Sequence, residues 1–338
     1  MLKSFQNFLV VLFMCLLSSN TSAFCKKGIP VFNEKDLQKA VKEKKITELI
    51  INNIIKISKD MTIPHNFTLC FSEQGNFNIY GNLKILGFVN APTKRHIFKI
   101  KKGSITGRNT QIIYPGWFGA TGDGKKNDTN AFFRAGEFLS ESVDINGKTT
   151  GGGTLFIPYG IYKVGKQKIL KCTKKREICD FPTPEKILWI SNTKNKVIIE
   201  GIRDKHGKYP VLKLKRSMMA GVFGFRKMGE KGFFDIPVIP YRGFIVLAGA
   251  KKVKIKNIKL DGRLDTMRLG KPLKDGFQID TNGISSYATE ILEIENLQAV
   301  NNLTDGIRIG NHREKIKFLM YGIKNMIEWK SRADYLYD

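Results

Sequence analysis

The sequence predicts an all-β protein wound as a β-solenoid, in which the strands of successive coils stack on one another. Most of the chain consists of short β-type runs, several of which alternate apolar and polar residues and are separated by Gly, Asn or Asp. The apolar periodicity of an α-helix is scarce. In the second half of the chain the β-type runs recur as units of about 20–30 residues, as a solenoid requires.

The first 23 residues have the three-part layout of a secretory signal peptide. Lys3 gives a positive start, Phe8–Leu17 is an unbroken apolar run, and Ser18–Ala23 supplies small residues for cleavage. Ten apolar residues are too few for a membrane-spanning helix, which needs roughly 20. We therefore expect a mature protein that starts near Phe24, has no membrane span and is secreted or periplasmic. A permanent N-terminal anchor is the alternative.

Export would expose the remaining cysteines to an oxidising compartment. Cys172 and Cys179 lie seven residues apart in a charged, loop-like segment, and a local disulfide between them is the preferred pairing. Cys70 lies in the apolar run Phe67–Phe71, so a buried free thiol is an open alternative there. The pairing of Cys25 with Cys70 also stays open. No Cys/His cluster has zinc spacing, so no metal site is predicted.

Residues 24–115 are expected to form N-terminal β coils or a capping layer. Asp36–Lys44 is a candidate short helix, and Ile54–Ile57, Leu83–Leu86 and Ile97–Ile100 read as strands.

The clearest helix is predicted near residues 128–140. Asp128 is a good N-cap residue, and the segment that follows has one apolar face, formed by Ala131, Phe132, Ala135 and Leu139. We expect this helix to cover the open end of the solenoid and to hide its unpaired strand edge.

Three later runs resemble one another: Val197–Ile202, Val253–Ile258 and Leu292–Leu297. In addition, the pairs Gly283-Ile284 and Gly306-Ile307 lie 23 residues apart. A β-sandwich would explain the strands but not this recurrence, so we expect the runs to stack in neighbouring coils. The strands expected in this half are 154–157, 196–200, 211–214, 244–247, 253–260, 291–297 and 307–309.

Two segments in a fixed order carry a family resemblance. Trp117–Phe132 reads WFGATGDGKKNDTNAF and Gly151–Tyr162 reads GGGTLFIPYGIY. They resemble the opening motif of the pectate-lyase-like superfamily, which includes polygalacturonase-, rhamnogalacturonase-, epimerase- and tailspike-like proteins. Asn127 replaces a usual acidic residue, and Tyr159 replaces a small residue or proline. The resemblance covers roughly residues 116–310 and defines an expected second region, 116–338.

The resemblance implies a right-handed parallel β-helix that binds and cleaves an acidic polysaccharide, by glycoside hydrolysis or by lyase chemistry. A non-catalytic glycan-binding adhesin or structural solenoid is the alternative, so enzymatic activity stays open. Within the motif, Asp123 and Asp128 suit a turn and a helix cap, and we expect them to mark the fold rather than the catalytic site.

Glycoside hydrolysis needs two carboxyl groups on one surface. The candidates are Asp261, Asp280 and Asp305; Asp280 and Asp305 are 25 residues apart, close to one coil. Asp before Gly is common in turns, so the competing interpretation is that each of these residues merely begins a turn. Thr304–Ile307 resembles part of the first polygalacturonase motif, but the later motifs of that family do not occur in this sequence. No cofactor is expected, except Ca²⁺ if the chain is a lyase.

The chain carries a net charge of +27. Lysines alternate with apolar residues at 99 and 101, 213 and 215, and 254 and 256, which would turn them outward from strands. If the strands stack, Lys213, Lys215, Lys254 and Lys256 form a positive stripe that would attract an anionic polymer, with Arg308 and His312 near Asp305. A solvated surface inflated by codon bias is the alternative. Nucleic acid fits the charge, but the export signal and the lack of a binding motif exclude it as the expected partner.

The tail Lys315–Asp338 shows no obvious capping end, and Ile316–Phe318 reads like the start of another coil. The sequence therefore predicts a truncated or incomplete solenoid.

Overall fold

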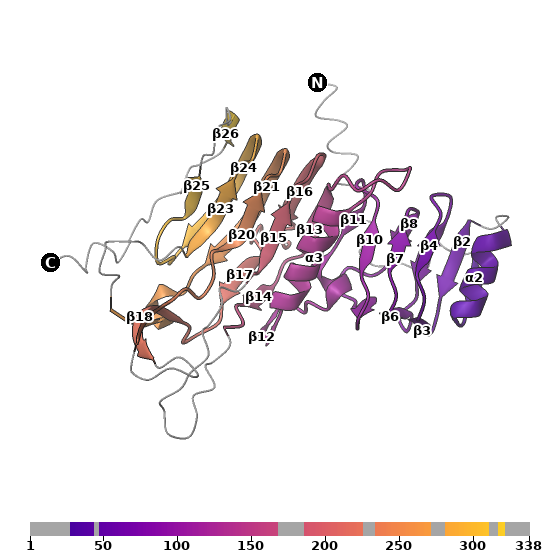
Figure 1. The fold of residues 1–338 in the computed structure, drawn as a ribbon, viewed down its shortest axis with the longest axis horizontal. Helices are drawn as coiled ribbons and strands as arrows, with labels where there is room; N and C mark the ends of the chain where they lie inside the picture. Colours follow the sequence, from indigo (N-terminus) through magenta and orange to yellow (C-terminus); the bar gives the residue numbers. More distant parts are fainter. Residues whose placement is uncertain are drawn as a thin grey trace, which may run out of the picture.

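The computed structural model describes residues 28–43, 47–167, 186–225, 234–271, 281–310 and 317–321. The expected signal peptide, Cys25, the Cys172–Cys179 pair, Asp280 and His312 lie outside these ranges. The described chain is elongated, with strands stacked along the long axis from α2 (Glu34–Glu43) at one end to β25 (Ile307–Gly310) and β26 (Lys317–Tyr321) at the other (Figure 1).

The N-terminal strands form three small parallel sheets, and from β2 to β10 every third strand joins the same sheet. Leu49 pairs with Leu69 and Leu69 with Val89, so each turn of the chain returns to the same wall after 20 residues. This arrangement is consistent with a parallel β-helix. The first sheet holds β1 (Ile29–Val31), β2 (Glu48–Ile51), β5 (Thr68–Phe71) and β8 (Phe88–Asn90); the second β3 (Ile54–Ile57), β6 (Asn76–Ile79) and β9 (Phe98–Ile100); the third β4 (Met61–Ile63), β7 (Leu83–Ile85) and β10 (Ile105–Gly107).

Two larger parallel sheets continue the stack. One has nine strands: β11 (Ile112–Ile113), β12 (Asp123–Asn127), β13 (Gly153–Ile157), β14 (Ile161–Val164), β16 (Lys196–Gly201), β17 (Val211–Leu214), β21 (Lys252–Asp261), β24 (Ile291–Val300) and β26 (Lys317–Tyr321). The other has four: β15 (Leu188–Ser191), β20 (Gly243–Ala248), β23 (Asn282–Tyr287) and β25 (Ile307–Gly310).

The recurring runs stack as the sequence predicts. Val197 pairs with Val253, which pairs with Leu292, and Ile284 pairs with Ile307. A β-sandwich is excluded for the described strands because these pairs are parallel. The expected spacing of about 20–30 residues is wrong for most of these later coils, because long segments between the strands leave the stack.

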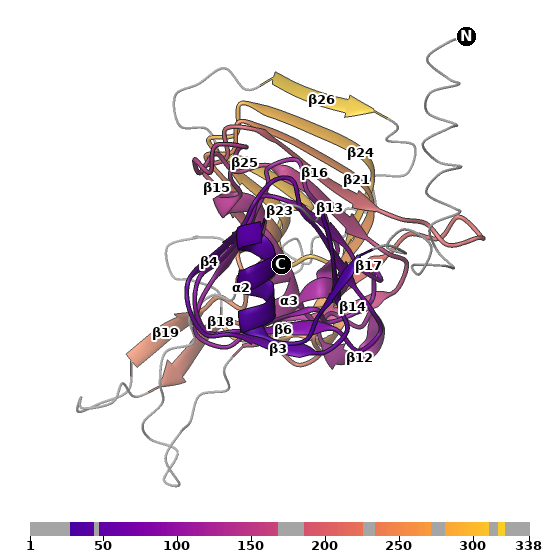
Figure 2. The same ribbon diagram turned by 90° about the vertical axis from the view of Figure 1, so that its right-hand side faces the viewer.

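One of these segments is the hairpin of β18 (Met219–Phe225) and β19 (Phe234–Val238), the one antiparallel pair among the named strands. It projects away from the stack, and β18 also pairs with the short β22 (Arg268–Leu269), which follows the single turn η2 (Leu264–Thr266) (Figure 2).

The interior is filled by inward side chains that lie above one another in successive coils. Val197, Val253 and Leu292 are fully buried, and so are Ile199 and Ile255. In the N-terminal half the same interior holds edge-to-face aromatic contacts that link Phe77, Phe71 and Phe98 to Trp117 in η1 (Pro115–Phe118). A single coil could not bury these faces, so stacking is the source of stability.

Asparagines bend the two longest strands. Asn257 in β21 and Asn296 in β24 have φ of 59° and 52°, a left-handed conformation that asparagine tolerates better than most residues. The bend lets the first half of β21 pair with β16 and the second half with β17. The two side chains also stack, since Asn296 Nδ2 donates to Asn257 Oδ1 at 3.1 Å.

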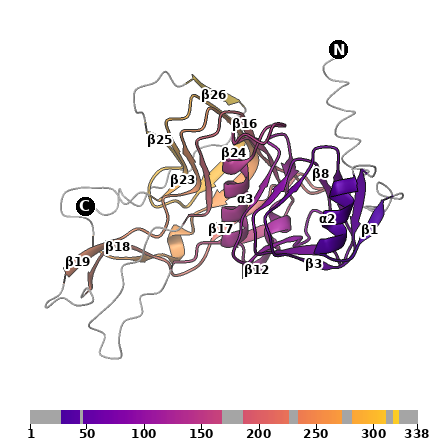
Figure 3. The ribbon, with the colours of Figure 1, turned by 45° about the vertical axis from the view of Figure 1, so that its right-hand side comes forward.

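The predicted helix is α3 (Thr129–Glu141), but its expected place at the open end of the solenoid is wrong. It packs against β10, η1 and β15 in the middle of the stack, and α2 lies at the N-terminal end (Figure 3). The helix still covers a strand edge: Ser191 N in β15 donates to Ser140 Oγ at 3.0 Å. The position follows from the sheet order: β15 is the first strand of its sheet, so no strand pairs with its outer edge. The helix α3 lies along that edge, between β15 and β10.

Asp128 occupies the predicted N-cap position but makes no capping bond to α3. Its buried carboxylate accepts the backbone N–H groups of Thr121 (2.9 Å) and Gly122 (3.2 Å) and so fixes the preceding loop. Gly151, Gly152 and Gly153 let neighbouring chain approach closely: all three have positive φ, and a Cβ on Gly151 would lie 2.7 Å from the Thr193 side chain. The motif residues therefore act on the fold, as expected.

Cys70 is buried on β5 and takes part in a disulfide, so the alternative of a free thiol is wrong. The other four cysteines lie outside the described residues. Within the described ranges, no helix has the length and apolar character needed to span a membrane.

Candidate anion-binding site

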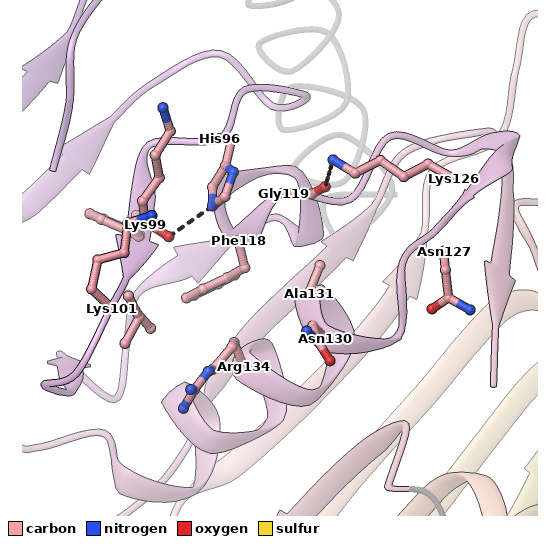
Figure 4. Close-up of a pocket in the computed structure, with 12 residues that line it drawn as sticks. His96, Lys99, Lys101, Phe118, Gly119, Lys126, Asn127, Asn130, Ala131 and Arg134 are labelled. Carbon is pink, nitrogen blue, oxygen red and sulfur yellow. Dashed lines mark hydrogen bonds between the residues drawn. The ribbon is translucent and has the colours of Figure 1, made fainter. Parts of the chain in front are cut away.

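A pocket of about 330 Å³ lies between β9, β12 and the first half of α3. Four cationic side chains line it: Lys99 and Lys101 from β9 and the residue after it, Lys126 from β12, and Arg134 from α3. Figure 4 shows Lys99 and Lys101 on one side and Lys126 on the opposite side, with His96 above and Arg134 below in the view. No carboxylate is among the twelve lining residues. We call this set the basic pocket.

The strand and helix patterns place these side chains. In β9 the core side chain is Phe98, so its neighbour Lys99 turns away from the interior. In α3 the buried face of Ala131, Phe132 and Ala135 docks on the stack, which leaves Asn130 and Arg134 at the rim of the pocket.

His96 is held in one orientation on the pocket wall. Its Nε2 lies 3.0 Å from the carbonyl oxygen of Phe98. Burial lowers the pKa of His96 below its ordinary value, and Lys99, Lys126 and Lys101 lower it further, against the opposite effect of the Phe98 carbonyl. The imidazole is therefore neutral at pH 7.

Two of the cations are anchored. Lys126 Nζ donates to the Gly119 carbonyl oxygen at 3.3 Å, and Arg134 Nη1 pairs with Glu137 Oε2 at 2.7 Å. The Arg134–Glu137 pair is partly exposed and contributes little stability, but it orients the guanidinium. The basic pocket thus combines two anchored donors, Lys126 and Arg134, with the ammonium groups of Lys99 and Lys101.

Concentrated like charge in a concave site raises the local concentration of counter-ions. The volume is at the lower end of the range for small-ligand sites, about 300–1,000 Å³. The arrangement suits an anionic group of modest size and offers no pair of carboxylates for hydrolysis.

The predicted catalytic residue Asp305 lies one coil above Asn282, and its predicted partner Asp280 lies outside the described residues. The Asp305 backbone N–H and the Thr304 hydroxyl both donate to Asn282 Oδ1, at 3.2 and 2.7 Å. The reason is the register, in which Ile284 pairs with Ile307. Burial raises the pKa of the Asp305 carboxyl.

Asp261 ends β21 in the nine-stranded sheet, whereas Asp305 precedes β25 in the four-stranded sheet. The Asp261 carboxylate accepts hydrogen bonds from Arg263 N and Asn301 Nδ2, and Lys213 Nζ lies 3.4 Å away. These contacts give Asp261 a structural role at the strand end.

The expected lysine stripe is not a row of like charges. The outward orientation is confirmed, but the stacking register places acids beside the lysines. Lys256 pairs with Glu200 at 2.8 Å and Lys254 with Glu295 at 3.2 Å. Lys99 belongs to a different sheet from these lysines, and Lys101 directly follows the same strand as Lys99.

Lys215 is exposed just after β17, and Arg308 lies on β25 in the other wall. The proposed substrate-binding residues are therefore spread over separate walls of the stack.

Sequence reasoning missed His96, Lys126, Asn130 and Arg134 as a group. The alternation at Lys99 and Lys101 is visible in the sequence, but the contribution from α3 depends on where that helix docks. His96 carries no sequence signal of its own, since Lys126 and Gly119 reach it only in the folded chain.

Ca²⁺, which a lyase would require, has no matching donors here: the described residues contain no group of three or more His, Cys, Asp or Glu able to hold a metal. In comparisons with known proteins, no family model and no curated protein matches this chain.

Proposed function

We propose that this chain is a secreted right-handed parallel β-helix protein of the pectate-lyase-like type that binds an acidic polysaccharide. The observation that carries the proposal is the basic pocket, with four cations and no carboxylate on its lining. The parallel stacking and the motif at 117–132 and 151–162 support the fold assignment.

Binding through the basic pocket is favoured over binding through the stripe of Lys213, Lys254 and Lys256. Those three lysines are ion-paired, so a polyanion would have to displace Asp261, Glu200 or Glu295. Among the described residues, no ion pair engages Lys99 or Lys101, and an incoming anion meets no such competition.

The test measures retention of the purified protein on immobilised polyuronate and on a neutral glucan. We expect retention on the polyuronate alone, weakened at high ionic strength because exposed charges are screened. The double variant Lys99→Gln/Lys101→Gln should lose retention, and the matched control Lys254→Gln/Lys256→Gln should keep it. If the control variant lost retention and Lys99→Gln/Lys101→Gln kept it, the pocket would be rejected as the binding site. Equal retention on the neutral glucan would reject the proposal as a whole.

Cleavage is the second candidate, and the raised pKa of Asp305 favours it. A raised pKa lets a carboxyl keep its proton to higher pH, as a general acid requires. Activity screening against polyuronides and bacterial glycans tests this candidate. If the protein is active, Asp305→Asn should abolish turnover, and full turnover in that variant would remove Asp305 from the mechanism. A non-catalytic adhesin predicts binding without any product.

A further inference from the structure

Two carbonyl groups at the basic pocket are already engaged as hydrogen-bond acceptors. The Phe98 oxygen accepts from His96 Nε2 at 3.0 Å, and the Gly119 oxygen accepts from Lys126 Nζ at 3.3 Å. Gly119 also packs on the face of the His96 ring, since a Cβ there would lie 2.9 Å from Nδ1 and Cε1 and 3.3 Å from Cγ. The imidazole is therefore packed as part of the pocket wall.

The Asn127 side chain, which also lines the pocket, is satisfied within the protein. Its Nδ2 donates to the Gly165 carbonyl oxygen at 2.8 Å, and its Oδ1 accepts the Thr129 N–H at 3.1 Å. The groups left for a ligand are mainly the ammonium and guanidinium donors. A ligand in this pocket must therefore supply acceptor oxygens.

The positive charge of the pocket exceeds what one carboxylate neutralises. Arg134 is paired with Glu137, but Lys99, Lys101 and Lys126 have no acidic partner among the described residues. Besides the effect of burial, these three lysines all lower the pKa of His96, so their charges act on one part of the wall. A phosphate monoester carries a charge of about −1.5 to −2 at pH 7 and three acceptor oxygens, more than a carboxylate offers.

The first turn of α3 adds to this positive potential. Asn130 and Ala131 in that turn line the pocket, and the turn holds no acidic residue. The Asp128 carboxylate before it makes no capping bond and accepts the Thr121 and Gly122 N–H groups instead. The N-terminal end of a helix favours anions, phosphate groups among them. The helix and the lysines therefore favour the same kind of ligand.

We propose that the basic pocket binds a phosphate monoester carried by a sugar of the polysaccharide. The ammonium groups of Lys99, Lys101 and Lys126 hold the phosphate oxygens. The volume of about 330 Å³ leaves room for a sugar ring beside the phosphate, along the apolar atoms of Ile100 and Phe118. This inference rests on the proposed binding of an acidic polysaccharide and names the acidic group that the pocket recognises.

The experiment compares three glucose derivatives with different acids at carbon 6: glucose 6-phosphate, glucose 6-sulfate and glucuronate. Calorimetric titration at about pH 7.5, where the phosphate ester is a dianion, measures each affinity. We expect glucose 6-phosphate to bind about 10-fold more tightly than either monoanion, the ratio that one additional charge-assisted hydrogen bond gives. By NMR, the bound dianion should raise the pKa of His96 relative to the free protein, which locates the ligand in the pocket.

The variant Lys99→Gln/Lys101→Gln should lose most of this preference, and the matched control Lys254→Gln/Lys256→Gln should keep it. Equal affinity for the three glucose derivatives, or a full preference in Lys99→Gln/Lys101→Gln, would overturn the inference. Inorganic phosphate separates the two sources of the group. The ester should bind more tightly because its ring contacts the apolar wall, and equal affinity would show that the ligand is free phosphate and not a sugar.

These outcomes are separate from those of the polysaccharide proposal. Retention on polyuronate that depends on Lys99 and Lys101, without any preference for glucose 6-phosphate, would leave that proposal intact and reject the phosphate site alone. The expected preference, with no retention on polyuronate or on a phosphorylated glucan, would reject the polysaccharide as the ligand and leave a site for small sugar phosphates.

Discussion

Asn257 shows how one residue can set the path of a whole coil. Its φ of 59° bends β21, and its Oδ1 accepts hydrogen bonds from Arg203 Nη2 and Asn296 Nδ2. The equivalent position one coil earlier is Gly201, where a Cβ would lie 1.9 Å from the Asn257 carbonyl oxygen. Gly201 thus leaves room for the Asn257 backbone, and Asn257 and Asn296 form the bend in the two later coils.

We expect Asn257→Ala to destabilise the protein by about 2 kcal/mol, because alanine pays for the left-handed conformation and loses two hydrogen bonds. Asn257→Gly keeps the conformation and should cost about 1 kcal/mol. Urea denaturation of both variants measures the difference. Equal loss in the two variants would show that the conformation contributes nothing.

His96 makes stability depend on pH in a defined direction. Its folded pKa lies below the ordinary 6.5, so the unfolded chain takes up a proton more readily than the folded protein. The stabilising contribution is complete above pH 6.5 and is lost as the pH falls through the folded pKa. The free energy of unfolding of wild type minus that of His96→Gln should therefore decrease between about pH 7.5 and 5. A constant difference across this range would contradict the assigned shift.

At the scale of elements, α3 is the piece that joins the two halves of the stack. Gly136 lets the helix backbone approach β15 closely: a Cβ there would lie 2.4 Å from the Trp189 carbonyl oxygen. Gly107 in β10 similarly makes room for the Phe138 ring on the other side of the helix. The helix thus takes the place of a strand between β10 and β15, and it packs closely against both of them.

This close approach reverses an ordinary expectation. Gly→Ala inside a helix is normally favourable by about 1 kcal/mol. Gly136→Ala should instead lower the thermal midpoint, because the new methyl group collides with backbone that cannot move freely. A higher midpoint in the thermal scan would show that α3 and β15 are less tightly packed than the structure indicates.

At the scale of the whole molecule, the net charge of +27 opposes compactness through self-repulsion. The exposed Lys–Glu pairs between coils offset little of it, since such pairs contribute roughly 0–1 kcal/mol. Stability should therefore rise as NaCl is increased from about 0.02 to 0.3 M, where the Debye length falls to well under 10 Å. Differential scanning calorimetry measures it, and a midpoint that falls with salt would show that the ion pairs outweigh the repulsion.

The sequence by itself determined the class of the fold and the pairing of its repeats. Alternation of buried and exposed residues is a local property of a strand. The runs 197–202, 253–258 and 292–297 could therefore be aligned with one another from the sequence, and these are the runs that pair in the structure. It also located α3, because an apolar face with a 3.6-residue period is local. It did not reveal how much chain leaves the stack between partners, since those segments carry no periodicity.

Only the tertiary structure decided where charges meet. A lysine that points outward can face another lysine or a glutamate, and the register between coils selects one of them. That register neutralised Lys254 and Lys256, placed Asn282 beneath Asp305, and brought His96, Lys99, Lys126 and Arg134 to one pocket. These contacts join residues from different coils, and the identity of a residue in the sequence does not specify its neighbour one coil away.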